Sequence, residues 1–373
     1  MGLKGGGTDG KKANLEAVYR QLEEQIAQVD FPALWKGFSP LKFAVYDDTR
    51  VFFDGHFVEK TSAFTANTAI NYEGEDIAIW YLVDDPDEAD TAILASKMIH
   101  EMFHAFQLKK GERRRAKELE ALMRYRYHTE NIGTRYKEAE LLRALSDRVN
   151  DGDEAAQTAR FRQLLALRAA RKERFPYEYA YEACTEQIEG SANYVELKAL
   201  EQLSPEKAEK ERAALLASTE DVSRCFPIRP LCYASGAFLL ELLHTERYLS
   251  LLAGDFDPEA FTDTPFSVDM LQDIPPAETL PKADEALAEQ LERFRTETEE
   301  LIEKTLEKND VLLEGDFALY SPNVYDARYR APYMTSRFFV AYTDDHGETQ
   351  VIREPMLLIE TDGNLRIKKV YRA

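Results

Sequence analysis

The sequence predicts an α+β protein in which a small N-terminal sheet leads into a helix, a large helical region follows, and β-structure ends the chain. Residues 41–82 contain short alternating or continuous runs of apolar and aromatic residues, which are typical of strands. Apolar residues then recur with helical spacing from about residue 90 to residue 308, and alternation returns from residue 311. These patterns divide the chain into five expected segments: a helical lead-in (1–40), a sheet with the first long helix (41–110), a helical region (111–280), a connecting helix (281–310) and a C-terminal β module (311–373).

Short strands are expected in the N-terminal sheet. Residues 41–46 and 51–53 are rich in aromatic and β-branched side chains. Residues 67–72 and 77–82 predict a hairpin, because the turn sequence Glu-Gly-Glu-Asp separates them. Acidic residues and a proline then end the second strand, and the next helix is expected to begin near Asp90.

That helix carries the pattern H-E-x-x-H, within the stretch that runs from Met98 to Gln107. Because one helical turn takes 3.6 residues, His100 and His104 lie one above the other on the same face. This spacing lets both imidazoles reach one tetrahedral zinc ion at about 2.0–2.1 Å. Glu101 can then hold a water molecule and act as a general base, since zinc lowers the pKa of water towards about 7.

The other positions of this stretch indicate a helix that is buried nearly all round. Five of them are apolar: Met98, Ile99, Met102, Phe103 and Phe106. The alternative interpretation is an ordinary core helix that carries two histidines by chance. The chain has only six histidines, so a chance match to the pattern is on the order of one in a hundred. The zinc interpretation is therefore favoured.

A zinc site needs a third protein ligand, and the favoured candidate is Glu189. The three residues that follow it, Gly-Ser-Ala, are small, so this helix can approach the histidine helix closely enough for a short carboxylate to reach the metal. Asn193, one turn further on, is expected to accept a hydrogen bond from a ligand histidine and to fix its tautomer. Three nearby glutamates remain open as alternative ligands: Glu182, Glu186 and Glu196.

The combination of H-E-x-x-H with the later sequence Glu-Gly-x-Ala-x-Tyr-x-Glu resembles the gluzincin metallopeptidases, particularly the peptidase MA-like group. The resemblance covers about residues 41–250 and implies a thermolysin-like catalytic core with Zn²⁺ as its cofactor. It implies that His100, His104 and Glu189 bind the zinc and that Glu101 is the catalytic base. Two features depart from the family: a helical insertion of about seventy residues precedes Glu189, and Asn193 stands where the thermolysin-like relatives place Asp.

The resemblance also implies a Tyr or His that donates to the oxyanion formed during peptide hydrolysis. Residues 230–244 predict another buried helix, which contains Tyr233 and His244. Eleven residues separate the two by about 16 Å along a helix, so they cannot both contact one metal. Tyr233 lies beside small residues and is the preferred donor, with a packed core tyrosine as the alternative. His244 is expected to be a helix-end residue.

Composition limits the partners of the chain. The 373 residues are 44 % hydrophobic and 31 % charged, and the net charge of −21 argues against nucleic acid or an anionic membrane surface. No apolar run approaches the ~20 residues of a membrane span. Three cysteines form no disulfide framework, and the first residues lack the hydrophobic core of an export signal. We therefore expect a cytoplasmic protein, with an export signal removed beforehand as the alternative; the oligomeric state is not predicted.

The rest of the chain predicts two further structures. In the helical region, a turn at residues 150–153 indicates an antiparallel helical hairpin. After Pro281, a long helix is expected to run to about Lys308. The final residues predict a small antiparallel meander with four strands: residues 336–342, 350–353, 356–360 and 365–371.

Two classes of function follow from these patterns. The first is a zinc-dependent metallopeptidase that hydrolyses peptide or protein substrates, with an extended substrate paired along an exposed sheet edge at residues 77–80. The second is a catalytically inactive metallopeptidase-like module for binding or regulation. Hydrolysis of a non-peptide amide is a related enzymatic alternative. Glu101 favours an enzyme, because a purely structural zinc site has no need of a carboxylate at that position.

Overall fold

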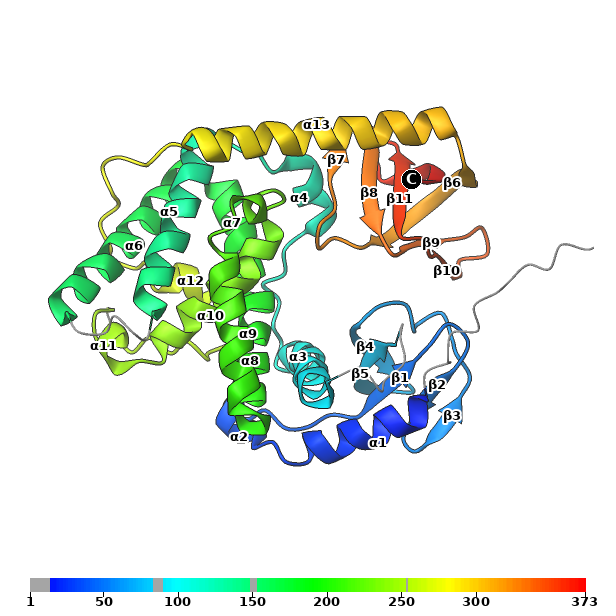
Figure 1. Ribbon diagram of the computed structural model, residues 1–373, viewed down its shortest axis with the longest axis horizontal. Helices are drawn as coiled ribbons and strands as arrows, with labels where there is room; N and C mark the ends of the chain where they lie inside the picture. Colours follow the sequence, from blue (N-terminus) through cyan, green and yellow to red (C-terminus); the bar gives the residue numbers. More distant parts are fainter. Residues whose placement is uncertain (1–13, 83–89, 148–152, 253) are drawn as a thin grey trace, which may run out of the picture. The chain divides into compact units, whose positions relative to one another are not determined.

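The structure, a computed structural model, confirms the α+β class (Figure 1). It contains a five-stranded mixed sheet, a helical region and a seven-stranded antiparallel sheet. The described residues are 14–82, 90–147, 153–252 and 254–373. The chain divides into two compact units: a first unit of residues 1–110 and 195–210, and a second unit of residues 111–194 and 211–373.

The first unit is built on the five-stranded sheet, with the strand order β3-β2-β1-β5-β4. Its strands are β1 (Phe43–Tyr46), β2 (Val51–Phe53), β3 (His56–Val58), β4 (Thr68–Tyr72) and β5 (Glu75–Tyr81). β1 and β5 are parallel, and the other neighbours are antiparallel. The expected strands and the hairpin are therefore confirmed, and β3 is a strand that the sequence patterns did not reveal.

The expected sheet edge at residues 77–80 is wrong. β5 is paired on both sides, since Ile79 lies opposite Ala44 of β1 and opposite Thr68 of β4. The reason is the parallel pairing with β1, a long-range contact that no local pattern encodes. The edge of the sheet on this side is β4.

Three helices of the first unit precede or follow the sheet: α1 (Leu15–Ile26), α2 (Phe31–Leu34) and α3 (Thr91–Lys109). Both α1 and α3 pack against the sheet (Figure 1). α3 begins where expected, because the Asp90 side chain accepts hydrogen bonds from the backbone N–H groups of Ala92 and Ile93. Its apolar side is held by an aromatic cluster in which Phe103 makes edge-to-face contacts with Trp35 and Phe38.

Residues 195–210 complete the first unit and hold the start of α3. Ala92 packs in one buried cluster with Leu200 and Ala208. The Lys207 ammonium lies 2.6 Å from the Asp90 carboxylate at the N-terminus of α3. These contacts fix the helix that carries the histidines against the C-terminal half of α8 (Ser191–Leu203) and the start of α9 (Pro205–Ser218).

The second unit contains most of the remaining helices. They are α4 (Glu118–Arg124), α5 (Thr129–Ser146), α6 (Glu154–Arg174), α7 (Pro176–Thr185), the π-turn η2 (Glu186–Gly190), the 3₁₀ turn η3 (Val222–Cys225), α10 (Arg229–Leu243), α11 (Glu246–Leu249), α12 (Phe266–Asp269) and α13 (Glu285–Lys308). α5 and α6 pack side by side, as expected for the helical hairpin. The predicted turn between them lies outside the described residues except for Asp153, which caps α6.

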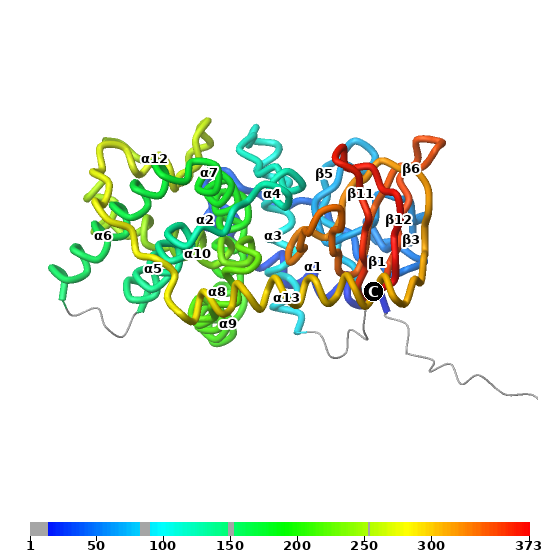
Figure 2. The backbone as a smooth tube through the Cα atoms, turned by 90° about the horizontal axis from the view of Figure 1, so that it is seen from above, coloured from blue at the N-terminus to red at the C-terminus, as the bar shows by residue number. Residues whose placement is uncertain are grey.

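The second unit ends in the seven-stranded sheet, with the order β10-β9-β6-β12-β11-β8-β7. Its strands are β6 (Val311–Pro322), β7 (Tyr329–Arg330), β8 (Tyr333–Arg337), β9 (Val340–Thr343), β10 (Thr349–Ile352), β11 (Met356–Thr361) and β12 (Arg366–Arg372). The sheet is antiparallel as expected, but it is not a meander, because the long strand β6 pairs with both β9 and β12. α13 lies along it (Figure 2), with Ile302 packed against Leu358 and Tyr371.

Across the described parts of the chain, no helix combines the length and the apolar character needed to cross a membrane.

Candidate metal centre

A continuous helical run of α7, η2 and α8 carries the four glutamates that compete as ligands. The run is not a regular α-helix, because residues 186–190 form a π-turn, a feature that often occurs at functional sites.

Gly190 has a different role from the one expected. A Cβ atom there would lie 2.5 Å from the Cα atom of Gly236 on α10, so the small residue permits close packing against α10.

The two histidines of α3 point at one position. Their Nε2 atoms lie 3.1 Å apart, and the rings are nearly perpendicular. His100 is buried, and His104 is half-buried. The spacing of i and i+4 on a helix therefore produces the convergence that the sequence predicted.

Each histidine has its other ring nitrogen fixed by an oxygen acceptor. The Nδ1 atom of His100 lies 2.9 Å from the Glu196 carboxylate, and the Nδ1 atom of His104 lies 3.0 Å from the Gln107 side-chain oxygen. A carboxylate accepts hydrogen bonds and does not donate them, so Nδ1 of His100 carries a proton that it donates to Glu196. The Gln107 side-chain oxygen is also an acceptor, so Nδ1 of His104 carries a proton as well. In both histidines the Nε2 atom therefore carries the lone pair.

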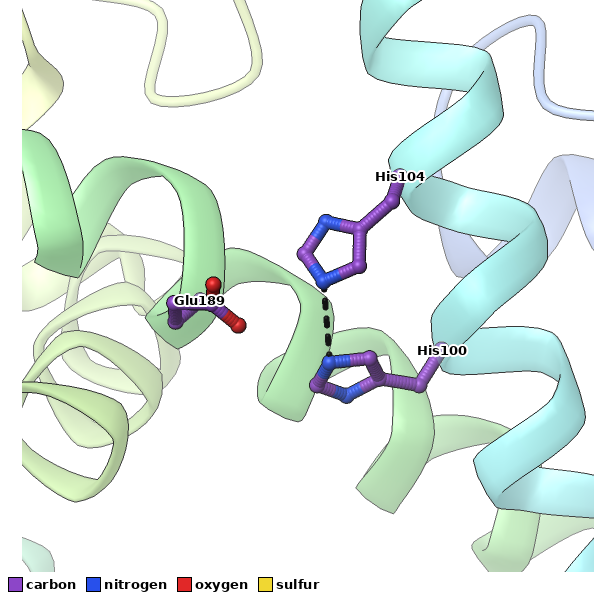
Figure 3. Close-up of side chains that lie close together, drawn as sticks. All are labelled: His100, His104 and Glu189. Atoms are coloured by element: carbon purple, nitrogen blue, oxygen red, sulfur yellow. Dashed lines mark hydrogen bonds between the residues drawn. The ribbon is translucent and has the colours of Figure 1, made fainter. Parts of the chain in front are cut away.

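Glu189 completes the group (Figure 3). One carboxylate oxygen of Glu189 and one ring nitrogen each of His100 and His104 all lie within 4.8 Å of one another. Within the described residues, this is the one such group of His, Cys, Asp or Glu side chains that could hold a metal ion.

The donor atoms fit a zinc ion. Two lone pairs that face each other across 3.1 Å repel, and a cation placed next to both removes that repulsion. Two nitrogens bound to a tetrahedral zinc ion at the usual bond length would lie about 3.3 Å apart, which is close to the separation found here. Histidine nitrogen and carboxylate oxygen are also the donor types of catalytic zinc sites, and hydrogen bonds from ligand histidines to carboxylates are typical of them.

An ion pair holds Glu189 from its own side. The Arg229 guanidinium on α10 lies 2.9 Å from the Glu189 carboxylate and 3.4 Å from that of Glu118. Arg229 also donates to the hydroxyl of Tyr233 at 2.9 Å. Burial raises the pKa of Tyr233 well above its ordinary value, and the neighbouring Glu189 raises it further although Arg229 lowers it. The Tyr233 hydroxyl therefore keeps its proton and lies close to Glu189.

The other candidate ligands have different partners. Glu182 and Glu186 belong to a buried network of ion pairs: Arg135, Glu138, Arg168, Arg171, Glu182 and Glu186. Glu186 lies 2.5 Å from Arg168 and 3.0 Å from Arg135, so both its oxygens are occupied. Glu196 accepts a hydrogen bond from Nδ1 of His100, which is the role that we expected of Asn193.

The sequence analysis did not assign the contacts that three residues make at the site: Gln107 and Glu196 with the histidines, and Arg229 with Glu189. Gln107 lies three residues after His104 on the same helix, so the spacing held a usable signal. Glu196 follows Glu189 by two turns on the same helical run, which is also a readable spacing. Arg229 approaches from a helix that is distant in sequence, and no local pattern points to it.

His244 lies at the end of α10 as expected, and its Nε2 atom is 3.0 Å from Glu259.

Comparisons with protein-family models, curated proteins and solved structures find no match for this chain.

Proposed function

We propose that the protein is a zinc-dependent metallopeptidase of the gluzincin type, in which His100, His104 and Glu189 bind the metal and Glu101 is the general base. The observation that carries the proposal is the convergence of three zinc-type donors, with the histidine tautomers fixed so that both lone pairs face the same point. A bound zinc ion supplies Lewis-acid polarisation of the scissile carbonyl and activation of water.

The residues of the chain supply the remaining chemistry. Glu101 follows His100 on α3 and is half-buried, so its carboxylate can take a proton from the attacking water and later deliver it to the leaving amine. The protonated hydroxyl of Tyr233 is the proposed donor to the oxyanion. Arg229 orients Glu189 and Tyr233, because its guanidinium contacts both.

An extended substrate would use the open edge of the N-terminal sheet. That edge is β4, which pairs with β5 on one side and with no strand of the described residues on the other. Main-chain hydrogen bonds to β4 would bind a peptide with little dependence on its side chains.

The test is the substitution Glu101→Gln, which keeps the size and the hydrogen bonding of the side chain but removes the base. In a peptide-library assay, cleavage by the zinc-loaded variant should fall by about 10²–10⁴-fold, the usual contribution of general acid–base catalysis. Zinc content and thermal stability should stay at the wild-type values. Tyr233→Phe should reduce cleavage less, because the metal remains as the main electrophile.

Three results would contradict the proposal. Zinc-loaded wild-type protein that binds peptides but cleaves none in a broad library would support the inactive binding module. If peptides survive but simple amides are hydrolysed in a Glu101-dependent way, the non-peptide amidase is supported. Peptide cleavage that persists in Glu101→Gln would belong to another site or to a contaminant.

A further inference from the structure

The second unit contains a cavity beside α10 that no step of the proposed reaction uses. Its volume is about 480 Å³. Aromatic and aliphatic side chains form much of the wall, among them Tyr127, Tyr181 and Phe294. A cavity of this size accepts one or two amino-acid side chains, and its apolar wall lowers the local dielectric constant.

The wall of the cavity contains more arginines than acidic residues. Five arginines line it: Arg126, Arg229, Arg295, Arg328 and Arg330. Glu299 is the one acidic side chain among the described lining residues. Carboxylates compensate four of these arginines: Glu118 and Glu189 pair with Arg229, Glu292 with Arg295, Glu297 with Arg328 and Glu299 with Arg330. Arg126 and the weakly paired Arg295 are therefore the guanidinium groups through which the wall can attract an anion.

Three of these guanidinium groups can donate further hydrogen bonds to a ligand. The Nε atom of Arg229 is buried and has no hydrogen-bond partner among the described residues. The side chain of Arg126 takes part in no ion pair within the described part of the chain. Arg295 has one ion pair, a 3.7 Å contact with Glu292 on the same exposed helix face. Exposed pairs of that kind contribute little, so a ligand can replace them at small cost.

The cavity adjoins the candidate metal ligand. Arg229 is part of the cavity wall, and the same guanidinium lies 2.9 Å from the Glu189 carboxylate. Tyr181, another wall residue, donates through its hydroxyl to Glu118, which also faces Arg229. The cavity and the candidate metal ligand therefore share one neighbouring side chain, Arg229.

We propose that this arginine-lined cavity binds a carboxylate of the substrate, so that the enzyme prefers peptides with an acidic side chain or a free C-terminus near the scissile bond. The inference rests on the proposed function, because a substrate must reach the metal site for the cavity to select it. Arginine suits the role, since its planar fork donates two parallel hydrogen bonds to a carboxylate.

The test measures binding to zinc-loaded Glu101→Gln protein, in which the peptide stays intact. Four labelled hexapeptides are compared by fluorescence anisotropy: one sequence with Glu or with Gln at two central positions, each with a free or an amidated C-terminus. At least one carboxylate peptide should bind about tenfold more tightly than the neutral peptide. The arm that gains affinity shows whether the side chain or the C-terminus is recognised. The difference should shrink as salt concentration rises.

A matched pair of double variants locates the binding. Arg126→Gln with Arg295→Gln removes two cavity arginines and should abolish the tenfold preference. Arg113→Gln with Arg293→Gln removes the same charge from exposed arginines outside the cavity, Arg293 lying two residues from Arg295 on α13, and should preserve it. Equal binding of the four peptides, or equal loss in both double variants, would overturn the inference. Cleavage of neutral and acidic peptides at the same rate by wild type would also overturn it, while the proposed function would stand.

Discussion

Two pairs of glutamates on the helical run of α7, η2 and α8 have different partners and different roles. Glu182 and Glu186 are buried and face three arginines from α5 and α6. Glu189 and Glu196 remain partly exposed, and their carboxylates lie at the histidines of α3. The amino acid is the same in all four cases, so the facing partners decide which carboxylates are structural and which are available to a metal.

The π-turn helps to separate the two roles. Its wider hydrogen-bonding pattern adds a residue to one turn, so Glu189 is rotated away from the face that Glu186 occupies. On one side of the turn, burial of the carboxylates is compensated by guanidinium groups, because an unpaired buried charge costs several kcal/mol. On the other side, the charge of Glu189 is shared between Arg229 and the metal position.

The largest expected difference between the two pairs is in stability. Glu186→Ala should lower the free energy of unfolding by about 3–5 kcal/mol, because three buried arginines would then face only Glu138 and Glu182, which leaves one buried positive charge uncompensated. Glu189→Ala should cost about 1–2 kcal/mol, since Glu118 stays beside Arg229. Urea unfolding of the metal-free proteins measures both. Equal losses would show that the two carboxylates are equivalent in the fold.

A somewhat smaller effect is expected from pH. Burial raises the pKa of Glu186, but Arg168 and Arg135 outweigh it and lower the pKa from the ordinary value of 4.5 to about 2. The folded state therefore holds the proton less tightly than the unfolded state. The stabilisation, about 3 kcal/mol, is present above pH 4.5 and is lost as the pH falls towards 2.

Urea unfolding between pH 7 and pH 3 tests this expectation. Wild-type protein should lose stability steeply below pH 4.5, and Glu186→Gln, which cannot titrate, should lose less over the same interval. Parallel curves for the two proteins would mean that Glu186 is not the group responsible.

The third expected difference is in zinc affinity. It distinguishes Glu196 from Asn193 as the hydrogen-bond partner of His100. Removing the hydrogen-bond partner of a ligand histidine typically weakens metal binding about 10–100-fold. Glu196→Ala should therefore weaken zinc binding by this factor in a competition titration with a chelator, because the Nδ1 proton of His100 loses its acceptor. Asn193→Ala is the control and should bind zinc as the wild type does. A loss in the control alone would restore the role first expected of Asn193.

The sequence predicted much of the local structure of the site, because that information is local. The H-E-x-x-H spacing and the cap at Asp90 act within a few turns of helix, whereas the role expected of the small residues after Glu189 was wrong for Gly190, which packs against α10. The sheet topology was not predicted, since the parallel pairing of β1 with β5 and the place of β6 depend on contacts between distant segments. Arg229 was missed for the same reason.

The central claim is that His100, His104 and Glu189 form one zinc site, and metal analysis of purified protein tests it most directly. Wild-type protein prepared with zinc and then dialysed should retain about one zinc ion per chain. Glu189→Gln should retain far less, and Glu186→Gln, altered one turn earlier on the same helical run, should retain as much as wild type. Wild-type protein without bound zinc, or a Glu189→Gln variant that keeps its full complement, would contradict the account.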